Sequence, residues 1–198
     1  MYGKMYSKMH GTTIVAVHKD GVSAIAGDGQ VTLGDTIMKT GAVKVRALAD
    51  GEVLTGFAGA TADAFTLLEK FEGYLSANKN NLLKASVDTV KEWRTDRMLR
   101  NLEAMMIVAD SERILLISGV GDVVSPDSQV AATGSGGAYA QAAALALMEN
   151  TDMGAAEIAE KAIGIAAGID IYSSGNATVL SVSADKNANE KAEKKDES

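Results

Sequence analysis

The order in which strand and helix patterns follow one another constrains the fold of this chain more than any other feature. Runs of β-branched residues come first, two helical patterns follow, more strand patterns come next, and two further helical patterns precede a closing strand. Single helices between strands are typical of parallel sheets. Paired helices between groups of strands instead predict two antiparallel sheets packed face to face, with a helix pair covering each outer side.

The expected strands are short and are bounded by turn residues. Asp20-Gly21 and Asp50-Gly51 each separate two such runs, and an Asp-Gly pair in this position predicts a hairpin. The strands predicted in this way are Thr12–Lys19, Val22–Ala26, Val43–Leu48, Glu52–Ala58, Glu103–Asp110, Arg113–Ser118, Gln129–Thr133 and Ala177–Ser183.

The four helical patterns show apolar residues three or four positions apart. The first repeats through Ala64, Leu68, Phe71 and Leu75, and the second runs from Leu83 to Trp93. The other two are predicted over Tyr139–Glu149, whose many alanines require close packing against a neighbouring element, and over Glu157–Ala167.

Composition removes several kinds of catalytic site. The 198 residues include no cysteine, which excludes thiol nucleophiles, disulfide scaffolds and cysteine-based zinc sites. Two histidines, His10 and His18, leave little room for a conventional Ser-His-Asp triad, and His18 lies six residues beyond Thr12, roughly 20 Å along an extended strand. If the chain is a hydrolase, its general base is therefore expected to be a rarer group.

Charge and hydropathy limit the kinds of molecule that the chain can be expected to bind. The net charge of −7 argues against sequence-independent binding of nucleic acid, which needs a basic surface. No apolar run approaches the ~20 residues of a membrane-spanning helix, so we expect no membrane partner and a cytoplasmic location. Residues 1–11 are predicted to be a leader, 12–183 a single domain, and 184–198 a charged, disordered tail.

Gly11-Thr12-Thr13, at the front of the first strand, offers an unusual nucleophile. A hydroxyl needs a nearby base, and cleavage after Gly11 would place the new α-amine of Thr12 beside its own hydroxyl. Because such an amine has a pKa near ~8, it can accept the hydroxyl proton at neutral pH. The alternative is that Thr12 merely begins a strand.

Other residues supply the groups that such a nucleophile requires. A lysine at position 44 would lower the pKa of the amine and stabilise developing negative charge, and Asp28 could hold Lys44 or the amine in its charged form. Backbone N–H groups at Gly56 or Gly59 are candidates for an oxyanion hole, and Ser135 for a hydrogen bond to the amine. Taken singly, each of these residues also suits an ordinary strand, turn or close-packing position.

Several sequence strings resemble the HslV family, the bacterial proteasome-like peptidases also called ClpQ. They include TTIVAV, AGDGQVTLGDT, KVRAL, TGFAGATADAFTLLEKFE, EWRTDRMLRNLEA, SGVGDVVSPD and ATGSGGAYAQAAALAL. The resemblance covers about residues 12–183 without internal gaps. It implies an α+β fold, the four-layer αββα sandwich of N-terminal nucleophile hydrolases, and a threonine endopeptidase.

The resemblance also implies roles for particular residues. Thr12 corresponds to the nucleophile, Lys44 to the supporting lysine, Asp28 to the carboxylate, Ser135 to the serine near the amine and Gly56 to an oxyanion N–H. An 11-residue leader is longer than we expect in this family, and either autoprocessing or a separate protease would have to remove it.

A structural cation is a further implication of the resemblance. The family binds sodium, potassium or magnesium through backbone carbonyls that correspond here to Ala167, Asp170 and Ser173. The usual Gly, Cys and Thr side chains are absent at these positions, and Asp170 could add a carboxylate ligand. No cofactor is expected for catalysis itself.

The resemblance implies an assembly as well. The family forms a homo-dodecamer of two stacked hexameric rings, and a hexameric HslU-type AAA+ ATPase feeds it unfolded proteins. ATP would be used by that partner, and no nucleotide motif is found in this sequence. Two other hypotheses stay open: a non-catalytic or dormant ring subunit that keeps its leader, and an amidase of the same fold class.

Overall fold

The strands and helices lie in the order that the sequence predicts, with a few additional short strands. A computed structural model describes residues 9–59, 61–95, 104–118 and 121–184. The strands are β1 (Met9–His10), β2 (Thr13–Lys19), β3 (Val22–Asp28), β4 (Val31–Leu33), β5 (Thr36–Lys39), β6 (Val45–Leu48), β7 (Val53–Ala58), β8 (Met105–Ala109), β9 (Ile114–Ser118), β10 (Val123–Val124), β11 (Val130–Gly134) and β12 (Ala177–Ser183). The α-helices are α1 (Thr61–Ala77), α2 (Leu82–Thr95), α3 (Gly137–Asn150) and α4 (Ala155–Ala167).

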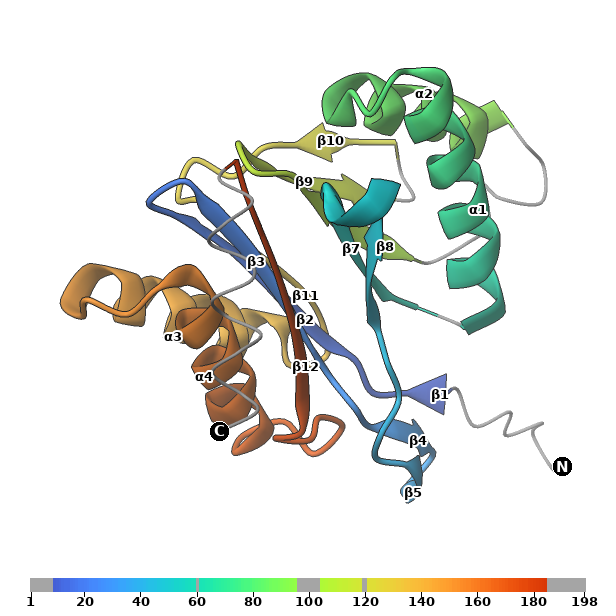
Figure 1. The fold of residues 1–198 in the computed structure, drawn as a ribbon. Coiled ribbons are helices and arrows are strands. Elements are labelled where there is room, and N and C mark those ends of the chain that lie inside the picture. The colour runs from blue at the N-terminus through green and yellow to red at the C-terminus, as the bar shows by residue number, and fades with distance from the viewer. Residues whose placement is uncertain (1–8, 60, 96–103, 119–120, 185–198) are drawn as a thin grey trace, which may run out of the picture.

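Two antiparallel sheets form the centre of the molecule. One has the strand order β11-β2-β3-β12 and the other β10-β9-β8-β7-β6. Helices α3 and α4 pack on the first sheet and α1 and α2 cover the second, so that four layers stack as helices, sheet, sheet and helices (Figure 1). The predicted αββα sandwich is therefore confirmed.

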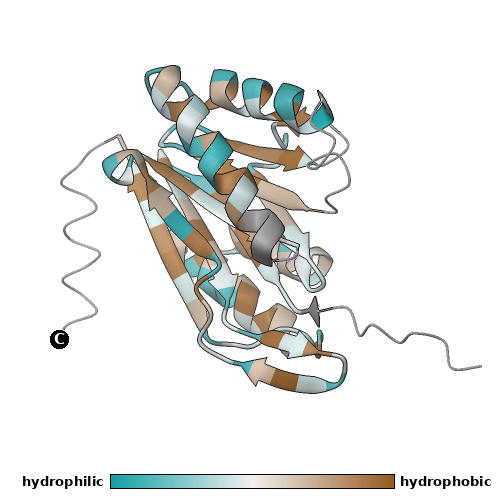
Figure 2. Cartoon of the chain, turned by 90° about the vertical axis from the view of Figure 1, so that its right-hand side faces the viewer, coloured by the Kyte–Doolittle hydropathy of each residue, from teal (hydrophilic) through white to brown (hydrophobic). Residues whose placement is uncertain are grey.

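The alternation of side chains along the central strands divides the core into layers. Ile14 and Ala16 of β2 face the other sheet, whereas Val15 and Val17 face α3 and α4. This is the period-two pattern of a strand buried on both faces. The Ala-rich helix α3 buries Ala140 and other small residues against α4 and the sheet, as its composition requires. Figure 2 shows the resulting brown, apolar strands between helices whose outer faces carry more teal.

A small third sheet was not predicted from the sequence. It has the order β1-β4-β5, and its β4–β5 hairpin projects beside the sandwich (Figure 1). Every residue of β5 is exposed, including Ile37 and Met38, so the strand lacks the buried face that produces a readable alternation. The sequence therefore gave no strand signal for this segment.

One strand boundary matters for function. The strand expected over Val43–Leu48 begins at Val45, so Lys44 lies just before β6. Val45 faces the space between the sheets, whereas the Lys44 side chain is paired with Asp28. The Lys44 side chain is oriented by hydrogen bonds to Gly11, Asp28 and Gln30.

Some expectations fall outside the described residues: most of the leader, and the charged tail from position 185 onward. Within the described residues, no helix combines the length and the apolar character needed to cross a membrane.

Candidate active site

Thr12 lies immediately before β2, at the end of the sandwich where β3 stops and β6 begins. Its hydroxyl donates a hydrogen bond to the Gly11 carbonyl oxygen at 2.7 Å. Gly11 has a φ of +119°, and a Cβ at this position would lie 2.8 Å from the Tyr172 carbonyl oxygen. Because only glycine adopts this conformation without strain, the residue before the candidate nucleophile is fixed by the local backbone.

Lys44 is the centre of the site. Its ammonium group donates to the Asp28 Oδ1 at 2.7 Å, to the Gly11 carbonyl at 2.7 Å and to the Gln30 carbonyl at 2.5 Å. The Lys44 side chain is 10% exposed and that of Asp28 is fully buried. Three donors thus meet three acceptors, which is the arrangement that a buried ammonium needs.

The environment of Lys44 changes its proton affinity. Burial lowers the pKa of the Lys44 ammonium below its ordinary value of 10.5, and the nearby carboxylates of Asp28 and Asp170 oppose that effect. Lys44 is therefore a cation whose charge is balanced by carboxylates but partly destabilised by the loss of water.

Asp28 holds the surrounding backbone as well as Lys44. Its Oδ1 accepts the Thr13 N–H at 2.7 Å, and its Oδ2 accepts the N–H groups of Gln30 at 2.8 Å and Ser174 at 3.2 Å. This carboxylate therefore joins β2, the turn after β3 and the loop after α4. The sequence-based expectation that it orients Lys44 agrees with this geometry.

A second carboxylate, Asp170, organises the opposite side of the site. Its Oδ2 accepts hydrogen bonds from Ser135 Oγ at 2.7 Å and from Ser173 Oγ at 2.6 Å. Ser135 Oγ also lies 3.3 Å from the Thr12 carbonyl oxygen, and Ser173 Oγ lies 2.5 Å from Thr13 Oγ1. Asp170 thus orients two serines that contact the first two residues of the candidate catalytic strand.

The predicted cation site shares these residues. The Asp170 carboxylate accepts hydrogen bonds from Ser135 and Ser173, and its Oδ1 accepts the Tyr172 N–H at 3.2 Å. The Asp170 carbonyl accepts the Ser173 N–H at 3.1 Å. No group of three or more His, Cys, Asp or Glu side chains suited to a metal occurs among the described residues. Cation binding by the carbonyls of Ala167, Asp170 and Ser173 stays a prediction.

The backbone N–H of Gly56 does not point toward this cluster, so it is not available there as a hydrogen-bond donor. It lies inside β7, opposite Val45 on one side and Ile107 on the other. The neighbouring Phe57 N–H donates to the Lys44 carbonyl on the β6 side, so the Gly56 N–H points to β8 and belongs to that ladder. Gly59, the other glycine that the sequence offered, lies beyond the end of β7 with a φ of +147°.

His18 is near the other end of β2 from Thr12. Its Nδ1 is 2.8 Å from Ser23 Oγ on the paired strand. The expectation that it does not serve Thr12 agrees with this position.

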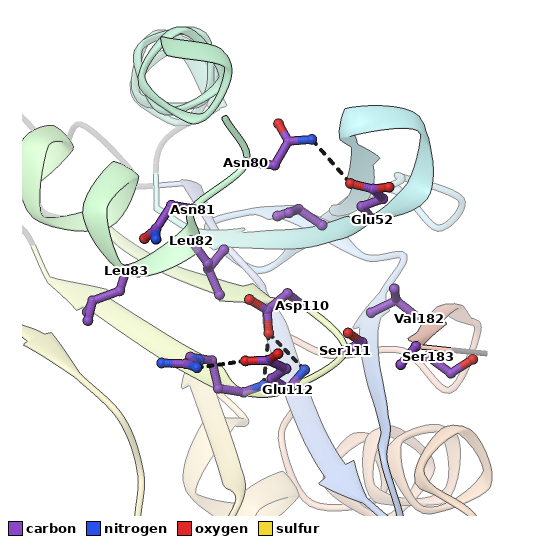
Figure 3. Close-up of a pocket in the computed structure, with 13 residues that line it drawn as sticks. Glu52, Asn80, Asn81, Leu82, Leu83, Asp110, Ser111, Glu112, Val182 and Ser183 are labelled. Atoms are coloured by element: carbon purple, nitrogen blue, oxygen red, sulfur yellow. Dashed lines mark hydrogen bonds and ion pairs between the residues drawn. The ribbon is translucent and has the colours of Figure 1, made fainter. Parts of the chain in front are cut away.

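A cavity of about 410 Å³ lies at the far end of the sandwich (Figure 3). Its rim carries Glu52, Asp110 and Glu112, and Asp110 accepts the N–H groups of Glu112 and Arg113 at 2.9 Å each. These residues lie at the turns opposite the Thr12 end. The cavity is therefore separate from the candidate active site.

Sequence reasoning missed some residues of the site. Gln30 contributes a carbonyl to Lys44, the Thr13 hydroxyl contacts Ser173, and the Asp170 side chain accepts a hydrogen bond from Ser135. Asp170 and Ser173 are predicted only as cation ligands, through the family resemblance, and their side-chain hydrogen bonds have no signal in the sequence.

Comparison with known proteins places the chain in a family. Residues 8–182 match the family model described as proteasome subunit. The ATP-dependent protease subunit HslV of Treponema denticola is 57% identical over 171 residues, which cover 86% of this chain and 96% of that protein. The crystal structure of eukaryotic HslV from Trypanosoma brucei superposes with a TM-score of 0.81 at 44% identity, covering 86% of this chain and 99% of that one.

A more distant structural likeness concerns the fold alone. Thiobacillus denitrificans BPH in complex with epoxomicin has a TM-score of 0.67 at 18% identity and covers 87% of this chain and 99% of that one.

Proposed function

This chain belongs to the proteasome subunit family and within it to the HslV peptidases, and on that premise we propose that Thr12 is the nucleophile of its threonine endopeptidase activity. The chain is the proteolytic subunit of an ATP-dependent protease. The observation that carries the Thr12 assignment is the position of Lys44 and Asp28 beside the Gly11–Thr12 bond.

The proposed reaction is acyl transfer. After removal of the leader, the Thr12 hydroxyl attacks the carbonyl carbon of a substrate peptide, and the free α-amine of Thr12 takes the proton and returns it to the leaving amine. The Lys44 ammonium, held by Asp28, stabilises the negative charge that develops. Water then hydrolyses the resulting ester and frees the hydroxyl of Thr12.

Oxyanion stabilisation also requires a backbone donor. The resemblance assigned this role to Gly56, but its N–H points into the β7–β8 ladder, so we favour Gly59 at the end of β7. Ser135, held by Asp170, is placed to hydrogen-bond the new α-amine next to the Thr12 carbonyl.

We propose that the chain removes its own leader. The Gly11 carbonyl accepts hydrogen bonds from both the Thr12 hydroxyl and the Lys44 ammonium, which polarises the bond to be cut. Attack of Thr12 Oγ on this carbonyl forms an ester, breaks the Gly11–Thr12 C–N bond and leaves the hydroxyl proton on the freed nitrogen. Water then hydrolyses the ester. The products are the leader, with a carboxylate at Gly11, and a chain with a free α-amine at Thr12.

The pairing of β1 with β4 suggests how a polypeptide substrate is held. Met9 lies opposite Leu33 and His10 opposite Thr32 in an antiparallel ladder, so the residues before the Gly11–Thr12 bond are extended. Backbone pairing of this kind binds chains of varied sequence. It therefore suits an enzyme that degrades unfolded proteins.

The assembly is proposed to be two stacked hexameric rings that bind a hexameric HslU-type ATPase, located in the cytoplasm. Exposed apolar side chains on the β4–β5 hairpin, in the last turn of α4 and after it support contact between copies; they include Leu33, Ile37, Met38, Ile165, Ile169 and Ile171. Sodium, potassium or magnesium on the backbone carbonyls of Ala167, Asp170 and Ser173 would be structural, and ATP would be consumed by the partner alone.

The test compares three versions of the chain. Intact-mass spectrometry of the full chain should give the mass of a protein that begins at Thr12, and the cognate ATPase with ATP should stimulate its casein hydrolysis. The Thr12→Ala chain should assemble, retain the leader and lose all detectable hydrolysis. A third protein, released from a removable fusion so that it begins directly at Thr12, should be active without self-cleavage.

The alternatives predict other results. Retention of Met1–Gly11 by the wild-type chain from its native cells would favour a dormant ring subunit. Strong unstimulated cleavage of one small amide would favour an amidase, and a fully active Thr12→Ala protein would refute the nucleophile assignment.

A further inference from the structure

Gln30, between β3 and β4, has an unusual set of contacts for a residue outside the predicted catalytic group. It is 4% exposed, and its carbonyl oxygen accepts the Lys44 ammonium at 2.5 Å. Its side-chain Nε2 donates to the Ile171 carbonyl at 2.9 Å and to Thr32 Oγ1 at 3.0 Å. One residue thus joins Lys44, the start of β4 and the loop after α4.

Removal of the leader makes the Gln30 carbonyl more important. Lys44 has three acceptors in the uncut chain, and one of them, the Gly11 carbonyl, leaves with the leader. Asp28 and the Gln30 carbonyl then remain. A buried ammonium depends on each acceptor because water is excluded, so the direction of the Gln30 carbonyl affects both the position of Lys44 and its charge.

The Gln30 side chain fixes that direction. A short segment between two strands can rotate its peptide groups, but the buried amide is bonded at both hydrogens, to Thr32 and to Ile171. Two further bonds tie the same segments together, from Gly29 N to Ser174 Oγ at 3.3 Å and from Ser174 N to Asp28 Oδ2 at 3.2 Å. The loop after α4 therefore serves as the support for the turn that carries Gln30.

We propose that Gln30 is a positioning residue for the peptidase reaction. Its side-chain amide donates a hydrogen bond to the loop after α4, and this bond holds the backbone carbonyl of Gln30 against the Lys44 ammonium. The role of Lys44 in this statement rests on the proposed function. The placement of Lys44 by Gln30 does not, and it can be measured separately.

Gln30→Met keeps the length of the side chain and removes both hydrogen bonds that the side-chain amide donates. In the chain that begins at Thr12, we expect kcat for casein hydrolysis with the ATPase to fall about tenfold, the size of one hydrogen bond to a charged group, with little change in KM. The alkaline limb of the kcat profile should move to lower pH. The charged groups that act on Lys44 in the structure are Asp28 and Asp170, and both are retained in the variant. The α-amine that leader removal would create at Thr12 is retained as well.

A chemical measurement separates this proposal from the proposed function. The rate at which acetic anhydride acylates Lys44, followed against pH by peptide mass spectrometry, reports the proton affinity of Lys44 whether or not the protein hydrolyses peptides. We expect its midpoint to move down by up to about one pH unit in Gln30→Met. An inactive wild-type protein would refute the proposed function, and the acylation profile would still decide the role of Gln30.

Two variants control for folding. Thr89→Val in α2 removes a comparably buried hydrogen bond, from Thr89 Oγ1 to the Ala85 carbonyl at 2.8 Å, far from Lys44, and should leave both pH profiles unchanged. If Gln30→Met does not fold, Gln30→Leu also removes the donors without adding a charge, and the same shift is expected. Wild-type profiles in a folded Gln30 variant, or a shift equal to that of Thr89→Val, would overturn the proposal.

Discussion

The two ends of the sandwich hold their charges in opposite ways. At the Thr12 end, the Lys44 side chain is 10% exposed and its partner Asp28 is fully buried, whereas at the far end Arg113 and Glu112 are 46% and 70% exposed. Asp28 also accepts three backbone N–H groups. Charge that is buried and fully hydrogen-bonded can be held in place for chemistry, and charge in water can move and is screened.

The largest contrast in unfolding free energy is expected when an aspartate at each end is replaced by asparagine. Asp28→Asn removes the buried carboxylate beside Lys44 and should cost about 3–5 kcal/mol of unfolding free energy, since it leaves a buried cation without its partner. Asp110→Asn changes a half-buried residue that accepts the N–H groups of Glu112 and Arg113, and should cost ~1 kcal/mol or less. Urea denaturation of both variants measures the two values. Equal losses would contradict the comparison.

A smaller effect is expected from pH. Since the pKa of Lys44 is lowered in the folded protein, the unfolded chain binds this proton more tightly between that pKa and the ordinary 10.5. The contribution of Lys44 to stability should therefore rise as the pH increases through this window. Peptidase activity, which requires the charged ammonium, should fall in the same window.

Thermal unfolding and casein hydrolysis between pH 8 and about pH 10.5 test these opposite trends. Parallel loss of stability and activity would show that a group other than Lys44 controls the alkaline limb. Lys44→Met supplies the reference for stability, because it has no ammonium to titrate.

The smallest effect is expected from Arg113→Ala at the rim of the far cavity. The pair with Glu112, at 2.8 Å, is exposed on both sides, so its loss should change the unfolding free energy by no more than about 0.5 kcal/mol. ATPase-stimulated hydrolysis should be unchanged. A loss of several kcal/mol would mean that the far end is as ordered by its charges as the Thr12 end.

Much of the architecture was predictable because it depends on local patterns. The expected strand Ala177–Ser183 has the bounds of β12, and the four helices lie where apolar residues repeat every three or four positions. The β4–β5 hairpin was missed because β5 buries no face and so carries no alternation. The strand predicted over Val43–Leu48 starts two residues before β6, because the burial of Lys44 beside Asp28 is not visible in the sequence.

The sequence by itself determined the order of elements, the absence of a cysteine or triad chemistry, and Thr12, Lys44 and Asp28 as candidate partners. Tertiary structure alone decided that the Gly56 N–H faces β8, that Asp170 holds Ser135 through its side chain, and that Gln30 supports Lys44. The physical reason is distance along the chain. Gln30 bonds Ile171 across 141 positions, and such a contact exists only once β3 and β12 have paired in one sheet.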